Sequence, residues 1–160
     1  MTRIGITGHS NLTDATADLV HAALRDALTL YAGAELVGVT CLARGADQIF
    51  ARAVLDVGGR VEVVLPAADY REEKVKPDNR AEFDELLIRA ACVRYMPFLT
   101  SGREAYMAAG EEVLKSTDRL MAVWDSGPSG GLGGTADVVE HVRRAGTPVD
   151  VIWPDGAERS

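Results

Sequence analysis

The sequence predicts an α/β fold, a single domain in which helices cover both faces of a mostly parallel sheet to give three layers. Strand-like stretches alternate along the chain with helix-like stretches of about ten residues or more, which is typical of βαβ units. Residues 119–124 (RLMAVW) are apolar without alternation, as expected for a strand that is covered on both faces. The length of 160 residues suits one domain with a substantial core.

The chain begins with a strand, a helix and a second strand. Residues 3–7 (RIGIT) are rich in β-branched residues and end at Gly8, which marks a turn. Thr13 is a suitable helix N-cap, and apolar residues at helical spacing follow it as far as Tyr31. Residues 35–42 (ELVGVTCL) then predict the second strand.

A helix, a strand and a polar segment come next. Residues 46–57 carry an apolar stripe at helical spacing, and the pair that begins at Gly58 ends this helix. Residues 60–65 (RVEVVL) predict the third strand, which stops at Pro66. Residues 67–76 are polar and show no periodicity, so they predict no regular element.

The second half of the chain repeats the alternation. Residues 78–91 and 103–116 predict helices, and the strands 93–96 and 119–124 follow them. A last helix is expected at 135–145, before a final strand at 149–153 (VDVIW). The domain is therefore expected to cover residues 1–153, and residues 154–160 to form a flexible tail.

Composition restricts the partners of this domain. The formal net charge of −7 disfavours nucleic acid as a partner, because a basic surface supplies most of that affinity. A small anionic ligand stays compatible with this charge, since a few backbone amides and one arginine are enough to hold a phosphate. The sequence has no membrane span or signal peptide, so we expect a cytoplasmic protein without a membrane partner.

Cysteines and histidines give no sign of a metal site or a cofactor, and we expect neither. Cys41 and Cys92 lie far apart without metal-ligand spacing. We expect both to be buried free thiols in a reducing compartment. The alternative is that they form a disulfide or that one of them is a reactive thiol.

Three glycine-containing loops connect the end of a predicted strand to the start of a predicted helix, at residues 7–11, 43–47 and 130–135. Loops of this kind lie at one edge of a parallel sheet, where ligands bind in open α/β folds. The start of a helix has unsatisfied amides and a partial positive charge, and glycine allows an anion to approach them. The alternative is a set of tight turns, although a turn does not need all the glycines between 127 and 134.

Arg44 lies between an apolar strand and a helix that starts at a glycine. A guanidinium at this position is suited to bind a phosphate with two hydrogen bonds. The alternative is a salt bridge, to Asp47 or to Asp125.

Other polar residues are expected at the same edge. His9 and Asn11 are candidates to bind a ribose or a base, although Asn11 is equally suited to cap a turn. Asp125 follows the apolar strand and is a candidate catalytic carboxylate. Asp137 is a second candidate. Alternatively, Asp137 has only a structural role, as a carboxylate in the first turn of a helix, where the helix dipole favours negative charge. Trp124 is expected in the core, with base stacking as the alternative.

Three motifs, GITGHSNL at 5–12, LARGAD at 42–47 and DRLMAVWDSGPSGGLGGTADVV at 118–139, resemble those of the SLOG superfamily. This group of Rossmann-like proteins includes LOG phosphoribohydrolases, the bacterial DNA-processing protein A and many small nucleotide-binding proteins. The resemblance spans nearly the whole chain and implies a Rossmann-like fold. It also implies a binding site for a nucleotide or a nucleotide-derived ligand, which is lined by Gly8, Arg44, Gly45, Gly133, Gly134 and Thr135.

Two positions depart from the pattern of this superfamily. Ser10 stands where relatives with this opening commonly carry an arginine after the histidine, so one anion contact is missing. Val138 stands where the LOG enzymes place a catalytic glutamate, and the nearest acids here are Asp137 and Glu140.

The leading hypothesis is a protein that binds a phosphate-bearing nucleotide at the C-terminal edge of the sheet and acts as a sensor. The expected ligand-binding residues are Gly8, His9, Asn11, Arg44, Gly45, Gly131, Gly133, Gly134 and Thr135. The alternative is an enzyme, of the phosphoribohydrolase or deoxyribosyltransferase kind, that cleaves or exchanges an N-glycosidic bond with Asp125 and Asp137. A DNA-handling role is a third hypothesis, disfavoured by the charge. A homodimer is expected, with the helix 103–116 as its interface.

Overall fold

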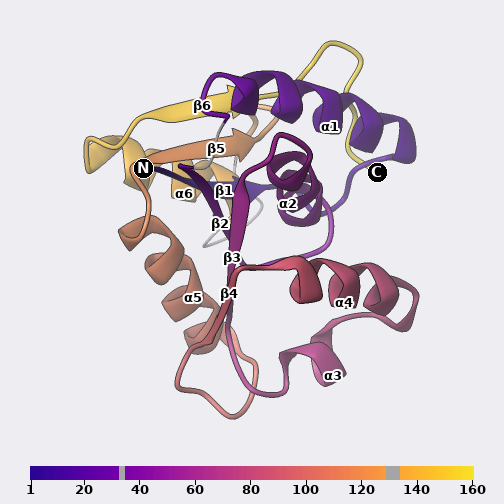
Figure 1. The fold of residues 1–160 in the computed structure, drawn as a ribbon, viewed down its shortest axis with the longest axis vertical. Coiled ribbons are helices and arrows are strands. Elements are labelled where there is room, and N and C mark those ends of the chain that lie inside the picture. Colours follow the sequence, from indigo (N-terminus) through magenta and orange to yellow (C-terminus); the bar gives the residue numbers. More distant parts are fainter. Residues whose placement is uncertain (33–34, 129–133) are drawn as a thin grey trace.

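The computed structural model describes residues 1–32, 35–128 and 134–160, and within them a single sheet organises the chain (Figure 1). All its strand pairs are parallel, in the order β4-β3-β2-β1-β5-β6. The strands are β1 (Thr2–Gly8), β2 (Leu36–Thr40), β3 (Arg60–Leu65), β4 (Cys92–Tyr95), β5 (Arg119–Val123) and β6 (Val149–Ile152). The predicted α/β fold class is confirmed, and the sheet is parallel throughout.

Helices follow the strands along the chain, as expected from the alternation. They are α1 (Asp14–Thr29), α2 (Ala46–Asp56), α3 (Tyr70–Lys74), α4 (Arg80–Arg89), α5 (Arg103–Lys115) and α6 (Thr135–Arg144). The short α3 lies in the segment that shows no periodicity. The helix expected at 78–91 is divided, because the 3₁₀ turn η1 (Pro77–Asn79) precedes α4.

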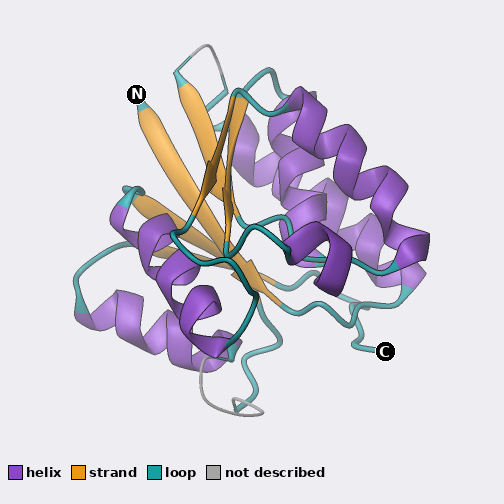
Figure 2. Cartoon of the chain, turned by 90° about the horizontal axis from the view of Figure 1, so that it is seen from below, coloured by secondary structure: helices purple, strands orange, loops and turns teal. Residues whose placement is uncertain are grey.

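The helices form layers on both faces of the sheet (Figure 2). Helices α1, α2 and α4 pack on one face, and their buried side chains, such as Leu24, Phe50 and Phe83, share one core with β1, β3 and β5. Helix α5 packs on the other face, where Ala109 and Val113 contact a smaller core from β2 and β3. Helix α6 also lies on this face, as Figure 1 shows.

The strand order creates a topological switch point beside β1. From β1 the chain adds β2, β3 and β4 on one side, and it then returns to place β5 and β6 on the other side. Gly8 at the end of β1 pairs with Val123 at the end of β5. The connections that leave these two strands therefore diverge at the C-terminal edge, where open α/β sheets bind their ligands.

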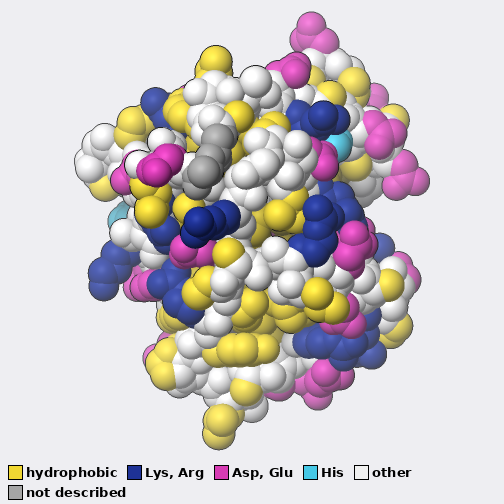
Figure 3. All heavy atoms as spheres, viewed as in Figure 1, with side chains coloured by type: hydrophobic (Ala, Val, Ile, Leu, Met, Phe, Trp, Pro, Cys, Tyr) yellow, Lys and Arg dark blue, Asp and Glu magenta, His cyan; other side chains and the backbone are white. Residues whose placement is uncertain are grey.

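Charged side chains of both signs are mixed over the face drawn in Figure 3, where Lys and Arg lie next to Asp and Glu. The structure accordingly contains many ion pairs, such as Arg3–Glu62 and Arg71–Asp84, both at 2.7 Å. No helix in the described part of the chain is long and apolar enough to span a lipid bilayer.

One expectation about buried residues is wrong: Cys92 is exposed, because β4 is an edge strand with only one neighbour.

Helix α5 was expected to form a dimer interface, and this stays a prediction. Its Ala105 and Ala109 are buried within the chain. Only part of α5 therefore faces outward, with Tyr106 and Met107 among its exposed residues.

Candidate functional site

Three loops meet at the C-terminal edge of the sheet, and we call them together the three-loop rim. They comprise residues 9–11 after β1, 41–45 after β2 and 124–128 after β5. The first two loops touch through Gly45, whose φ of 89° lies in the left-handed region. A Cβ atom on Gly45 would lie 2.7 Å from the Cα atom of Ser10 and 2.8 Å from the carbonyl oxygen of His9. Glycine is therefore required where these loops cross.

His9 joins the first loop to the third. Its backbone N–H donates to Val123 O (3.1 Å), and Asp125 N–H donates to its Nε2 (3.3 Å). The side chain is only 8% exposed, and its ring meets that of Trp153 edge to face at 5.7 Å. Burial lowers the pKa of His9, so the neutral ring accepts the Asp125 hydrogen bond. His9 thus holds the loops together, and its expected contact with a ligand stays a prediction.

Asp125 provides negative charge at the rim. Its Oδ1 accepts a hydrogen bond from Gly127 N–H (2.9 Å), which lowers the pKa of the carboxyl group. Asp125 is therefore ionised at neutral pH, and its Oδ2 lies 3.8 Å from Nη1 of Arg159. The other candidate carboxylate, Asp137, lies in the first turn of α6 and is partly exposed. The catalytic roles of both residues stay predictions.

Arg44 forms an ion pair at the surface. Its Nη2 lies 3.0 Å from Oδ2 of Asp78, and the two side chains are 52% and 70% exposed. The salt bridge that was the alternative for Arg44 therefore exists, although its partner is neither Asp47 nor Asp125. Exposed pairs of this kind contribute little to stability. The predicted phosphate contact of Arg44 remains compatible with this weak pairing.

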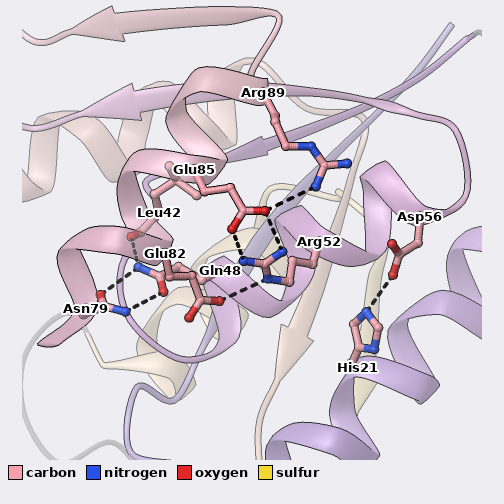
Figure 4. Close-up of polar contacts among 9 residues, drawn as sticks. All are labelled: His21, Leu42, Gln48, Arg52, Asp56, Asn79, Glu82, Glu85 and Arg89. Atoms are coloured by element: carbon pink, nitrogen blue, oxygen red, sulfur yellow. Dashed lines mark hydrogen bonds and ion pairs between the residues drawn. The ribbon is translucent and has the colours of Figure 1, made fainter.

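The second loop is shaped by a buried network of amide groups (Figure 4). Leu42 has a φ of 56°, which is rare for a residue with a side chain. Gln48 of α2 donates from Nε2 to Leu42 O (3.1 Å) and to Asn79 Oδ1 (2.9 Å), and Asn79 Nδ2 donates back to Gln48 Oε1 (3.0 Å). Both amide side chains are buried. They hold a strained loop conformation in place, which is a feature that functional sites often show.

Asp47 supports the same loop from the first turn of α2. Its Oδ2 accepts a hydrogen bond from Ala43 N–H (3.3 Å). Burial of the carboxyl group raises its pKa to about 7, although hydrogen bonds from Ala43, Thr40 and Cys41 act in the opposite direction. From the sequence, Asp47 was a residue of the LARGAD motif and a possible salt-bridge partner of Arg44. Its burial could not be predicted, because it depends on how the loops pack.

Two helices start at the rim from glycine. Helix α2 follows Gly45 and helix α6 follows Gly134, so neither has a side-chain N-cap. By contrast, α1 is capped by Thr13, whose Oγ1 accepts from Thr16 N–H (3.2 Å). In α2 the Ala46 N–H already donates to His9 O (3.2 Å), so the later first-turn amides of α2 and the first-turn amides of α6 are the groups that an anion can meet. Of the other predicted residues, Thr135 opens α6, Gly8 ends β1, and Gly131 and Gly133 lie outside the described residues.

A hollow of about 550 Å³ adjoins the third loop. Trp124 and Pro128 line it from the loop, and Val139, Glu140 and Arg143 line it from α6. The Nε1 of Trp124 donates to Gly127 O (3.0 Å), and the side chain is only partly buried. Trp124, the residue after β5, is thus a wall of this hollow. Arg44 does not line it.

The end of the chain also reaches the rim. The backbones of Leu12 and Arg159 form an antiparallel bridge, and Ser160 N–H donates to Asn11 O (2.8 Å). The side chain of Asn11 donates to Ser160 O (3.2 Å) and accepts from Arg159 Nε (3.2 Å). Its expected ligand contact stays a prediction. Nothing in the sequence of residues 158–160 indicates this pairing, because it depends on the fold.

No group of three or more His, Cys, Asp or Glu side chains in the described ranges is arranged to hold a metal ion. The polar groups at the rim are instead backbone amides, the Arg44 and Arg159 guanidinium groups and the Asp125 carboxylate, whereas the Asp47 carboxyl group is buried against the second loop. Amides and guanidinium groups favour an anion.

Comparison with known proteins reveals similar folds but no close sequence. No protein-family model matches the chain, and no curated protein matches it. DNA processing protein A from Streptococcus pneumoniae matches with a TM-score of 0.70 and 17% identity, over 98% of this chain and 52% of that protein. This chain thus spans about half the length of that similar structure.

Two further structures show the same fold. DNA processing protein A from Helicobacter pylori, which is described as binding single-stranded DNA, has a TM-score of 0.67 and 15% identity, over 99% of this chain and 68% of that one. The molybdenum cofactor binding protein from Rippkaea orientalis has a TM-score of 0.60 and 17% identity, over 96% of this chain and 77% of that protein.

These similarities correct one expectation and confirm another. The acidic charge led us to disfavour nucleic acid as a partner, and this is contradicted because DNA processing protein A is among the similar structures. The Rossmann-like fold that the resemblance to SLOG proteins implied is confirmed: this chain has the α/β architecture of these similar structures.

Proposed function

We propose that this chain binds a phosphate-bearing ligand, a nucleotide or a nucleotide derivative, at the three-loop rim. The observation that carries this proposal is the place of the rim at the switch point between β1 and β5, where Gly8 and Val123 are paired. Ligands of open α/β sheets bind in the crevice at such a point.

The geometry of the glycines supports a phosphate as the bound group. Gly45 and Gly134 leave the starts of α2 and α6 without a side-chain cap. Amides in the first turn of a helix carry a partial positive charge and attract anions. Gly45 also brings α2 close to the first loop, so an anion at this helix would meet both loops.

Arg44 supplies a guanidinium that a phosphate can engage. Its present partner, Asp78, is 70% exposed, so breaking the ion pair returns both charges to water at little cost. A guanidinium binds a phosphate with two parallel hydrogen bonds, which is a stronger arrangement than an exposed ion pair. We therefore expect Arg44 to exchange Asp78 for the ligand.

Turnover of the ligand is the second candidate function. The lowered pKa of Asp125 means an ionised carboxylate at the rim, which suits the stabilisation of an oxocarbenium-like transition state. Release of free base from nucleoside monophosphates by the wild type, with loss of release in Asp125→Asn, would support cleavage of an N-glycosidic bond. An absence of free base from every monophosphate would leave binding alone.

The direct test is a titration of the protein with nucleoside monophosphates and diphosphates, cyclic nucleotides, dinucleotides, inorganic pyrophosphate and a single-stranded DNA oligonucleotide. A ligand at about 100 times its Kd stabilises the folded protein by about 2.7 kcal/mol, which a thermal-shift measurement detects. Arg44→Ala should weaken binding by roughly tenfold or more. A flat response across all the compounds would refute the proposal, and a response to the oligonucleotide alone would indicate a DNA-binding protein instead.

A further inference from the structure

The chain from Pro154 to Ser160, which we call the C-terminal strap, lies across the first loop of the rim. Glu158 O accepts from Thr13 N–H (3.4 Å), and Glu158 N–H donates to Thr16 Oγ1 (2.7 Å). Together with the backbone bond from Ser160 to Asn11, these contacts fix the strap beside the start of α1. A segment remote in sequence thus forms part of the candidate site.

Arg159 extends from the strap toward the third loop. Its Nε donates to Asn11 Oδ1 (3.2 Å), and its Nη1 lies 3.8 Å from Oδ2 of Asp125. The side chain is 42% exposed. Within the described ranges no acceptor pairs with its Nη2. One hydrogen bond therefore positions the guanidinium, and the side chain is still exposed to solvent.

The charge balance of the rim gives Arg159 a function. The ionised Asp125 repels an anionic ligand that approaches the switch point, and a cation next to it offsets this repulsion. The Arg159–Asp125 contact is long and partly exposed, so it holds the guanidinium only weakly. The guanidinium can therefore turn toward a phosphate without losing a strong interaction.

We propose that Arg159, delivered by the C-terminal strap, is an anion-binding residue of the three-loop rim and receives a phosphate group of the ligand. This inference rests on the proposed function, since it assigns a residue of the same site. The phosphate bonds to the Nη1 and Nη2 edge, and the Nε bond to Asn11 keeps the guanidinium in position.

The test is calorimetric titration of the full chain with inorganic pyrophosphate and with adenosine 5′-monophosphate. Arg159→Ala should bind at least fivefold more weakly than the wild type, and Arg159→Lys should fall between them. Arg25→Ala is the matched control, because Arg25 is 53% exposed and its Nε lies 3.8 Å from Asp56 on a different part of the surface. The control should bind as the wild type does.

Two other results would overturn the inference. Unchanged affinity in Arg159→Ala would show that the residue does not touch the ligand, and increased affinity would show that the Arg159 side chain competes with the ligand for Asn11. Both leave the proposed function intact. If the wild type binds neither compound nor any other in the wider titration, the proposed function fails and the inference fails with it.

Discussion

Individual polar side chains determine the shape of the loop that carries Arg44. The backbone of Leu42 is held in the left-handed region by Gln48 on its carbonyl oxygen and by Thr40 Oγ1 on its N–H, at 3.1 and 3.0 Å. Asp47 fixes the next amide along, that of Ala43. The loop is therefore set by its own buried partners, independently of any ligand.

Asp47 should make the stability of the protein depend on pH in an unusual direction. Its pKa of about 7 lies above the ordinary value, so the folded state prefers the protonated carboxyl group. The stabilisation is complete below about pH 4 and is lost as the pH rises through about 7, by roughly 2–4 kcal/mol in total.

The substitution Asp47→Asn tests this, because asparagine keeps the shape of the side chain without the titration. Urea unfolding of both proteins between pH 4 and pH 8 should show the wild type losing stability relative to the variant as the pH rises. A constant difference between them across this range would mean that Asp47 has an ordinary pKa.

The buried amide pair should contribute more to stability than the ion pair next to it. Asn79→Ala leaves the Gln48 amide partly unsatisfied in the interior, at an expected cost of about 1–3 kcal/mol. Glu82→Ala is a suitable control, because its exposed contact with Arg52 contributes little and Glu85 still pairs with Arg52. Equal costs in chemical denaturation would contradict this account of the loop.

At the residue scale, the sequence indicated which side chains lie at the edge but not what they contact. Arg44, His9 and Asp125 are all placed there by the strand ends. The burial of His9 between Trp153 and Asp125 depends on two segments remote in sequence. The same holds for Asp78 as the partner of Arg44, because local sequence contains no information on a contact between separate loops.

Among the elements, the first two loops approach each other closely where they cross at Gly45. Gly45→Ala adds a Cβ atom to a backbone with φ of 89° and places it against the backbone of Ser10. We expect a loss of roughly 2–5 kcal/mol in stability, together with loss of phosphate binding as the loops separate.

Gly58→Ala provides the comparison for that prediction. Gly58 has a similar φ of 85°, but no atom lies within 4 Å of a Cβ atom built there. Its substitution should cost only the backbone strain, about 1–2 kcal/mol, and should leave binding unchanged. Similar costs for both variants in urea unfolding would show that the loops do not pack tightly at Gly45.

Element prediction succeeded where periodicity was strong and failed where tertiary contacts decide. The strands and the long helices followed their apolar patterns closely. Helix α3 has only five residues and no apolar periodicity. It is held by Arg71, whose Nε and Nη2 each donate a hydrogen bond of 2.7 Å to Asp84 of α4. An ion pair across 13 residues gives no local sequence signal.

For the whole molecule, the order of the strands decides where a ligand binds. Alternation in the sequence predicted a parallel sheet, and a parallel sheet places all the βα loops at one edge. The sequence did not predict that β1 and β5 would be neighbours with a switch point between them, because strand order depends on how the βα units pack. It likewise did not predict that the C-terminal strap would lie on the first loop.

Titration of isotopically labelled protein with inorganic pyrophosphate, followed through the amide chemical shifts, measures whether the three loops form one phosphate-binding rim. If they do, the amides of Ser10 and Gly45 and that of Gly134 before α6 shift together and saturate with one common Kd. Shifts confined to the hollow beside α6, such as those of Val139 and Arg143, or a rim that does not respond while the protein binds pyrophosphate elsewhere, would show that the loops do not form such a rim.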